Sequence, residues 1–180
     1  METPRPTMLT VILKTIVVHT VTYFVVGIIV FNLLDYPTRF AEPIVRELMR
    51  STDDPLVMAG PLFQPIRGLL FGIVFYLLRE VFFTKTNGWL ILWVTLAFLG
   101  IFSPFGPVSG SIEGMVYTYL PIPGQLIGLI EVLAQSFLLA AVTFYWVRHP
   151  EKRWLSWLLG GVFVIILLLT TLGLLMGGTA

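Results

Sequence analysis

The chain has no cysteine and few charged residues. Among its 180 residues there is no Cys, and Asp, Glu, Lys and Arg together make up only 12%. The absence of Cys excludes disulfides, iron–sulfur ligation by cysteine and thiolate catalysis. Soluble domains carry about 25% charged residues, so this chain has too few to cover a water-facing surface. With 57% hydrophobic residues and a mean hydropathy of +0.91, the composition indicates a helical membrane protein.

Other functional classes also lack the residues they need. The 11 Lys and Arg residues balance 10 Asp and Glu residues, so we expect no nucleic-acid partner. The sequence has no zincin motif, no nucleotide-binding loop and no His or carboxylate cluster with metal-ligand spacing, and we therefore expect no metal and no cofactor. We do not expect an enzyme. A lipid-modifying enzyme with Glu131 or Glu113 as general base is the weaker alternative.

Long apolar segments predict an all-α fold, a polytopic transmembrane helical bundle in a single domain over residues 1–180. A bilayer core of about 30 Å needs roughly 20 apolar residues in a helix. The unbroken apolar runs lack the two-residue alternation that membrane β-barrels require. The five expected spans cover about 9–34, 61–83, 88–103, 125–147 and 154–177.

Basic residues predict the orientation of these spans. With five crossings, the amino end and the loops at 79–88 and 148–153 share one side of the membrane. That side holds seven cations against three in the opposite loops. By the positive-inside rule we expect a cytoplasmic amino terminus and an extracytoplasmic carboxyl terminus. Since no Arg- and Ser-rich leader precedes the first span, we expect a plasma membrane.

The connection after the first span predicts a helix lying at the membrane surface. Phe40, Ile44 and Leu48 recur every four residues between charged positions, which favours an interfacial amphipathic helix over about 39–50. It is either a solvated helix packed on the bundle or a docking surface for a partner. Downstream, Asp54 followed by Pro55 is typical of a helix start.

The connection at 103–124 is rich in proline and glycine, with four of each, and its only charge is Glu113. A free aqueous loop would be more polar. We expect this outer loop to lie in the membrane interface or to be re-entrant between helices, where irregular backbone is tolerated only under protein or water.

Four polar side chains in the second and fourth spans would cost free energy to place inside a membrane. They are Gln64 and Arg67 in the second span and Glu131 and Gln135 in the fourth. Ionisable groups inside a membrane are rare and mark sites by default. Counted from Arg79 and Arg148 at the inner boundary, all four lie about 18–25 Å outward and form one polar layer. We expect the second span to pack on the fourth, with Arg67 meeting Glu131 and Glu113 as a competing partner.

The second span carries two further signals. Gly68 and Gly72 form a small-xxx-small pair that lets another helix backbone approach closely. Pro61 and Pro65 each remove a backbone donor, which predicts a kink or an unwound turn just outside Arg67. Interrupted helices beside polar side chains are typical of transporter sites, and also occur as plain kinks in helices that bind nothing.

Two hypotheses for the function remain open. In the first, the protein is a transporter or channel that binds a small solute, proton or anion at Arg67, Glu131, Gln64, Gln135 and Glu113. In the second, it is a non-catalytic accessory or scaffold subunit, and the Arg67–Glu131 pair is a structural lock, because a lone buried charge is strongly destabilising. Membrane lipids are expected partners in both, and we expect a homo-oligomer or a subunit of a larger membrane complex.

Overall fold

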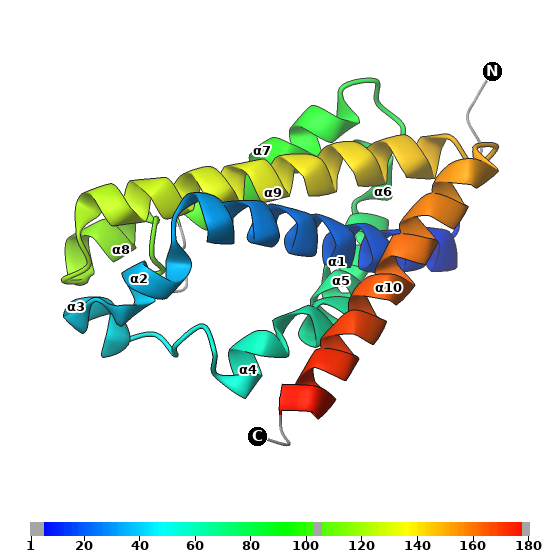
Figure 1. Ribbon diagram of the computed structural model, residues 1–180. Helices are drawn as coiled ribbons and strands as arrows, with labels where there is room; N and C mark the ends of the chain where they lie inside the picture. Colours follow the sequence, from blue (N-terminus) through cyan, green and yellow to red (C-terminus); the bar gives the residue numbers. More distant parts are fainter. Residues whose placement is uncertain (1–5, 103–105, 178–180) are drawn as a thin grey trace.

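The computed structural model describes residues 6–102 and 106–177, which form helices and no strand (Figure 1). The all-α prediction is confirmed. The longer helices are α1 (Met8–Leu33), α5 (Gly60–Leu77), α7 (Gly88–Phe102), α9 (Ile122–Arg148) and α10 (Arg153–Gly177). The short helices are α2 (Tyr36–Ala41), α3 (Pro43–Arg46), α4 (Pro55–Met58), α6 (Arg79–Phe82) and α8 (Ile112–Tyr117).

Four of the described helices are long and apolar enough to cross a membrane, namely α1, α5, α9 and α10. Helix α7 is strongly apolar but has 15 residues, about 22 Å of helix against a bilayer core of about 30 Å. The structure therefore indicates a membrane protein with four candidate spans, and a fifth crossing at α7 stays a prediction. Almost none of the α10 span is buried, which fits a helix that faces lipid.

Helix α1 lies at the centre of the bundle. It packs on α5 along one face and on α9 along the opposite face, while α7 covers α9 and α10 crosses α1 and α5 (Figure 1). Ile12 and Ile16 of α1 face α5, whereas Lys14 faces α9. At 100° per residue these positions lie on opposite sides of a helix.

Gly68 and Gly72 bring the backbones of α5 and α1 into direct contact. A Cβ atom at Gly68 would lie 2.7 Å from the Cα of Ile16, and one at Gly72 would lie 2.8 Å from the Cα of Ile12. The close approach predicted for this glycine pair is confirmed. Its expected partner was wrong: α1 lies between α5 and α9, so the second span does not pack on the fourth.

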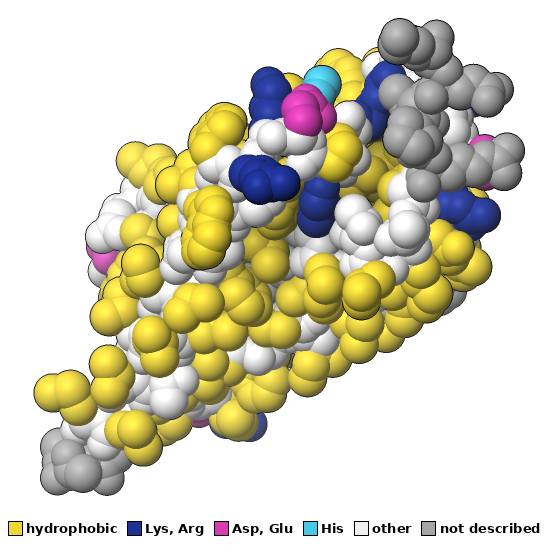
Figure 2. Space-filling model, turned by 90° about the vertical axis from the view of Figure 1, so that its right-hand side faces the viewer, with side chains coloured by type: hydrophobic (Ala, Val, Ile, Leu, Met, Phe, Trp, Pro, Cys, Tyr) yellow, Lys and Arg dark blue, Asp and Glu magenta, His cyan; other side chains and the backbone are white. Residues whose placement is uncertain are grey.

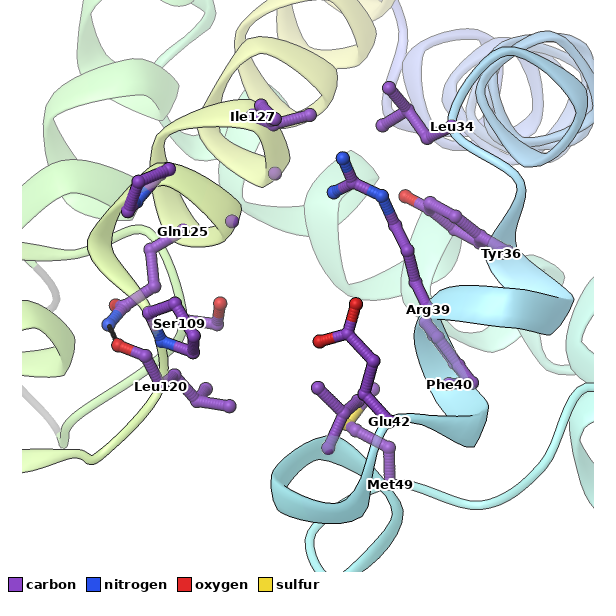
Figure 3. A pocket seen from close by; sticks show the side chains of 15 residues that line it. Leu34, Tyr36, Arg39, Phe40, Glu42, Met49, Ser109, Leu120, Gln125 and Ile127 are labelled. Carbon is purple, nitrogen blue, oxygen red and sulfur yellow. Dashed lines mark hydrogen bonds between the residues drawn. The ribbon is translucent and has the colours of Figure 1, made fainter.

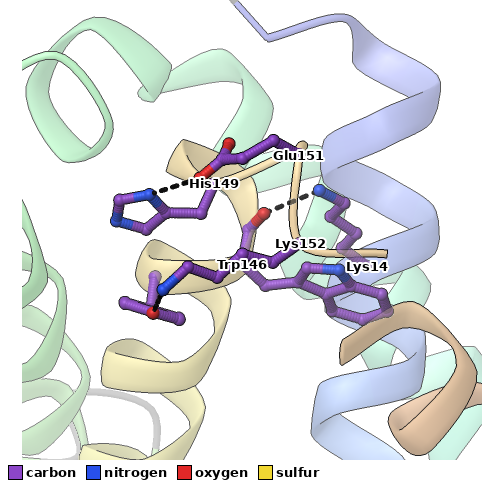
Figure 4. A network of polar contacts seen from close by, with 6 residues as sticks. Lys14, Trp146, His149, Glu151 and Lys152 are labelled. Atoms are coloured by element: carbon purple, nitrogen blue, oxygen red, sulfur yellow. Dashed lines mark hydrogen bonds and ion pairs between the residues drawn. The ribbon is translucent and has the colours of Figure 1, made fainter. Parts of the chain in front are cut away.

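Basic side chains gather at one end of the bundle (Figure 2). Lys14 of α1 donates to the carbonyl of Trp146 near the end of α9 at 2.7 Å (Figure 4). Arg148 donates to the carbonyl of Lys85, in the loop before α7, at 3.3 Å. These contacts bring together the three basic segments that the sequence assigns to one side of the membrane. We call this the basic end. Which compartment it faces stays a prediction.

The tightly packed core lies toward this basic end. Most of its members come from α1, the α5–α6 segment, α7 and α9, and they include Val11, Val18, Phe75, Phe82, Leu92, Leu139 and Trp146. The opposite end, formed by α2, α3, α8 and the first turns of α9, contributes few residues to this core. The bundle is therefore solid at the basic end and more open at the other.

The connection between α1 and α5 differs in part from its prediction. In place of one helix over 39–50, α2 ends at Ala41 and α3 begins at Pro43. Pro43 has no N–H to continue the ladder of α2, and its ring disfavours helical backbone at Glu42. The predicted helix start at Asp54 is confirmed, because its carboxylate accepts the N–H of Leu56 at 2.8 Å and Pro55 occupies the first turn of α4.

The prolines of α5 do not unwind it. The helix is continuous from Gly60 to Leu77, with Pro65 inside it, so the unwound turn is wrong and the alternative, a kink, stays a prediction. Pro61 lies in the first turn, where its missing N–H would have no helical partner. In the Pro/Gly-rich connection, the part that the structure describes folds into α8 and the turns around it. Its expected re-entrant placement stays a prediction, and residues 103–105 lie outside the described residues.

Candidate functional site

The predicted polar layer is divided into two groups by α1. Gln64 and Arg67 lie on α5, and the Arg67 guanidinium donates to the Gln64 side-chain oxygen at 3.4 Å. Glu131 and Gln135 lie on α9, across α1. An Arg67–Glu131 ion pair is not formed among the described residues, and α1 lies between the two helices that carry these residues. Glu113 lies in the first turn of α8.

The α5 group surrounds a buried histidine of α1. His19 is 1% exposed, and its ring stands edge-on to Phe71 at a centroid distance of 5.1 Å. Neither ring nitrogen has a hydrogen-bond partner among the described residues. Gln64, also buried, donates to the carbonyl of Gly60 at 2.9 Å.

The α9 group is organised by a residue that the sequence analysis missed. The Tyr36 hydroxyl donates a short hydrogen bond to the Glu131 carboxylate. Burial and the bond to Glu131 raise the pKa of the Tyr36 phenol above its usual range. The chain reaches this position because Asp35 adopts a left-handed conformation, with φ of 46°, and turns α2 away from the axis of α1. The pair Tyr36-Pro37 after Asp35, typical of a helix start, was the available signal.

Two adjoining cavities flank Tyr36. We call the first the α2–α9 cavity; it has a volume of about 390 Å³ and lies between α2–α3 and the start of α9. The second, the α1–α4 cavity, has a volume of about 640 Å³ and lies between α1 and the segment that leads into α4. Tyr36, Phe40 and Met49 line both cavities, so these side chains form the wall between them.

The α2–α9 cavity holds two side chains of opposite charge (Figure 3). Arg39 extends from α2 toward α9, and the Glu42 carboxylate points into the space between the two walls. The opposite wall comes from the Pro/Gly-rich connection and the first turns of α9, including Ser109, Leu120 and Gly128. Most of the remaining lining is apolar. The cavity is therefore an apolar space with one cation and one anion.

Gln125 holds the far wall of this cavity in place. Its side chain is 1% exposed and accepts the N–H of Gly110 at 3.3 Å. Its amide nitrogen donates to the carbonyl of Leu120 at 2.8 Å. One buried amide thus fixes two points of the loop that precedes α9. The sequence analysis missed this role, and the available signal was an amide directly after Pro123 and Gly124, which lie in the first turn of α9.

Nothing in the described residues forms a group of three or more His, Asp and Glu side chains arranged to hold a metal ion. Comparisons with known proteins find no match for this chain among protein-family models, curated proteins or solved structures. The functional argument therefore depends on the geometry of the two cavities and of the two polar groups beside α1.

Proposed function

We propose that this membrane protein moves a small solute across the bilayer, as a transporter or a channel, and that Glu131 contacts the solute. One observation carries the proposal: the Glu131 carboxylate lines a cavity of about 640 Å³ whose other walls are mainly apolar and aromatic. A carboxylate among apolar side chains is expensive to maintain in a membrane and is a functional group by default.

Helix α2 has the properties of a gate between the two cavities. Tyr36 and Phe40 stack at a centroid distance of 5.2 Å and line both cavities. The helix is six residues long, contains no buried residue, and lies between the left-handed Asp35 and Pro43. A movement of α2 would join the cavities and release Glu131 from Tyr36 without disturbing the main core.

The other residues selected from the sequence take different places in this proposal. Gln135 lies one helical turn beyond Glu131 on α9 and supplies neutral hydrogen bonds on the way to the basic end. Arg67 and Gln64 form a second polar group across α1, where Arg67 would hold an anionic group. Glu113 lines neither cavity, and we assign it no contact with the solute.

The proposal includes the membrane arrangement expected from the basic residues. Helix α7 would be a fifth, short crossing, since α1, α5, α7, α9 and α10 follow one another with loops at alternate ends of the bundle (Figure 1). The basic end would face the cytoplasm of a plasma membrane, and the cavities would open on the outer side. A homo-oligomer would cover part of the exposed apolar surface.

An accessory subunit is the second candidate, favoured by the exposure of α10. Trp157 is 82% exposed and Met176 is 74% exposed, so α10 offers a long apolar face to lipid or to a partner. This candidate depended on an Arg67–Glu131 lock, and that ion pair is not formed among the described residues. We therefore favour transport.

The test is solute-evoked current from purified protein in liposomes on a solid-supported membrane. The applied probes are protons, inorganic anions, organic anions and organic cations. At least one should evoke a current in the wild type that Glu131→Gln loses, while both proteins elute as the same species from a sizing column. Glu47→Gln is the matched control, because Glu47 is exposed and lines neither cavity. No current above protein-free liposomes, or equal currents in both proteins, would refute the proposal.

A further inference from the structure

We propose that the α1–α4 cavity binds a lipophilic organic cation, with Glu131 as its counter-ion and the surrounding aromatic rings as its walls. This inference deepens the proposed function and rests on the same site. It concerns the chemical class of the ligand, which the transport proposal leaves undefined.

The charge of the cavity is the first argument. Its lining contains two charged side chains, Arg50 and Glu131. Arg50 is bound to Asp54 at 2.9 Å, and its side chain is 61% exposed, so its charge is both paired and screened by solvent. Glu131 accepts the Tyr36 hydroxyl and forms no ion pair among the described residues. The uncompensated charge of this cavity is therefore negative.

The neighbouring cavity does not reverse this sign. Arg39 lines the α2–α9 cavity together with Glu42. Figure 3 shows both side chains on the α2–α3 side of that cavity, and neither lines the α1–α4 cavity. An anionic ligand in the α1–α4 cavity would meet the Glu131 carboxylate, and the one basic side chain in the lining, Arg50, is already paired with Asp54.

The aromatic lining is the second argument. Five rings face the cavity, from Tyr23, Phe24, Phe31, Tyr36 and Phe40. Phe31 stands edge-on to Tyr36 at a centroid distance of 6.1 Å, and Tyr36 stacks on Phe40 at 5.2 Å, so three of them form one continuous surface. The negative face of an aromatic ring attracts a cation, and the attraction grows when water is excluded.

The lining has few polar atoms that could replace the water around a cation, and this determines which class of cation fits. A metal ion or a small ammonium ion is strongly hydrated and needs several oxygen ligands to replace its water. This cavity offers one carboxylate and a few hydroxyls among apolar side chains. A cation that carries apolar substituents loses little hydration there and buries those substituents favourably. A volume of about 640 Å³ lies within the range of about 300–1,000 Å³ typical of small-molecule sites.

The test compares two probes of the same shape and opposite charge, tetraphenylphosphonium and tetraphenylborate. Equilibrium dialysis of protein in nanodiscs, with empty nanodiscs as the blank, gives the saturable binding of each. We expect saturable binding of the phosphonium that weakens at least tenfold in Glu131→Gln and remains unchanged in Glu47→Gln. Phe40→Leu should weaken it several-fold. Glu131→Asp keeps the charge and should bind the phosphonium more tightly than Glu131→Gln does. This comparison distinguishes loss of the charge from loss of the fold.

The outcomes separate this inference from the transport proposal. Equal binding of the two probes, or phosphonium binding that is unchanged in Glu131→Gln, would overturn the cation site. A Glu131-dependent current with another solute, without phosphonium binding, would overturn the cation site and leave transport supported. Charge-selective phosphonium binding that evokes no current would support the cation site and count against transport.

Discussion

The contact between α1 and α5 predicts that one added methyl group will destabilise the bundle. In Gly68→Ala the new Cβ would lie 2.7 Å from the Cα of Ile16 and 3.3 Å from its carbonyl oxygen. Favourable contacts between non-bonded carbon atoms lie at about 3.5–4.0 Å, so the two helices must move apart by about 1 Å. Gly72→Ala imposes the same displacement on Ile12.

The size of the effect follows from two opposing terms. Alanine is better than glycine in a helix by about 1 kcal/mol. Overpacking a tight contact costs about 1–3 kcal/mol, and the upper end applies here because the clashing atoms are backbone, which no rotamer change can move. Each substitution should therefore lower the free energy of unfolding by about 1–2 kcal/mol. Membrane helices depend on such van der Waals contacts for association, so lipid will not compensate for the loss.

The assay is reversible unfolding in mixed micelles, followed by circular dichroism. Gly161→Ala in α10 is the control, because a Cβ there meets no atom within 4 Å. That control should be as stable as the wild type or more stable. If Gly68→Ala and Gly161→Ala have the same stability, α1 and α5 are not in backbone contact and the packing described above is incorrect.

Three further predictions concern single polar side chains. His19→Leu should keep or raise the unfolding free energy, by up to about 1 kcal/mol, because it removes two buried nitrogens that have no hydrogen-bond partner within residues 6–102 and 106–177. A loss of stability would show that the His19 ring is hydrogen-bonded in the membrane. Gln125→Ala should cost about 1–3 kcal/mol, since it leaves the carbonyl of Leu120 unsatisfied. It should also speed proteolysis within 106–121, and unchanged cleavage would argue against the anchoring role. Because its pKa is raised, the Tyr36 phenol should stay neutral above the pH range in which tyrosine usually titrates. Ultraviolet difference spectra of the wild type and Tyr36→Phe over a pH series measure this. Ionisation of Tyr36 within the usual range would contradict the Tyr36–Glu131 hydrogen bond.

The helices and several local features could be predicted from the sequence because they depend on neighbouring residues. Apolar runs of sufficient length define α1, α9 and α10 to within a few residues and the start of α5, whereas α5 ends at Leu77 and not at the expected 83. The cap at Asp54 requires only the residues beside it. The spacing of Gly68 and Gly72 shows that some backbone approaches α5. Such patterns reveal which face of a helix is in contact, but they do not identify the helix on the other side.

The helix that packs against each span could not be predicted, because local patterns do not identify it. The sequence analysis placed Arg67 and Glu131 together because their depths agree, whereas the structure sets α1 between their helices. A signal for the central place of α1 was present in its hydroxyl residues. Thr15 and Thr22 are buried and return their hydroxyls to carbonyls one turn earlier. Side chains of this type are favoured where one membrane helix packs on another.

Two different parts of α1 serve helix packing and the proposed ligand binding. Its contact with α5 is made by backbone against Gly68 and Gly72, deep in the described bundle. Its continuation into α2 places Tyr36 against Glu131, at the end where the cavities lie and where α2 contributes no buried residue. A substitution at the glycine pair therefore reports on helix packing, and one at Glu131 reports on the cavity. Because α1 is one continuous helix of 26 residues, a shift of α1 against α5 would still move Tyr36. Loss of binding in a glycine variant would consequently arise through α1 and would not place those glycines in the site.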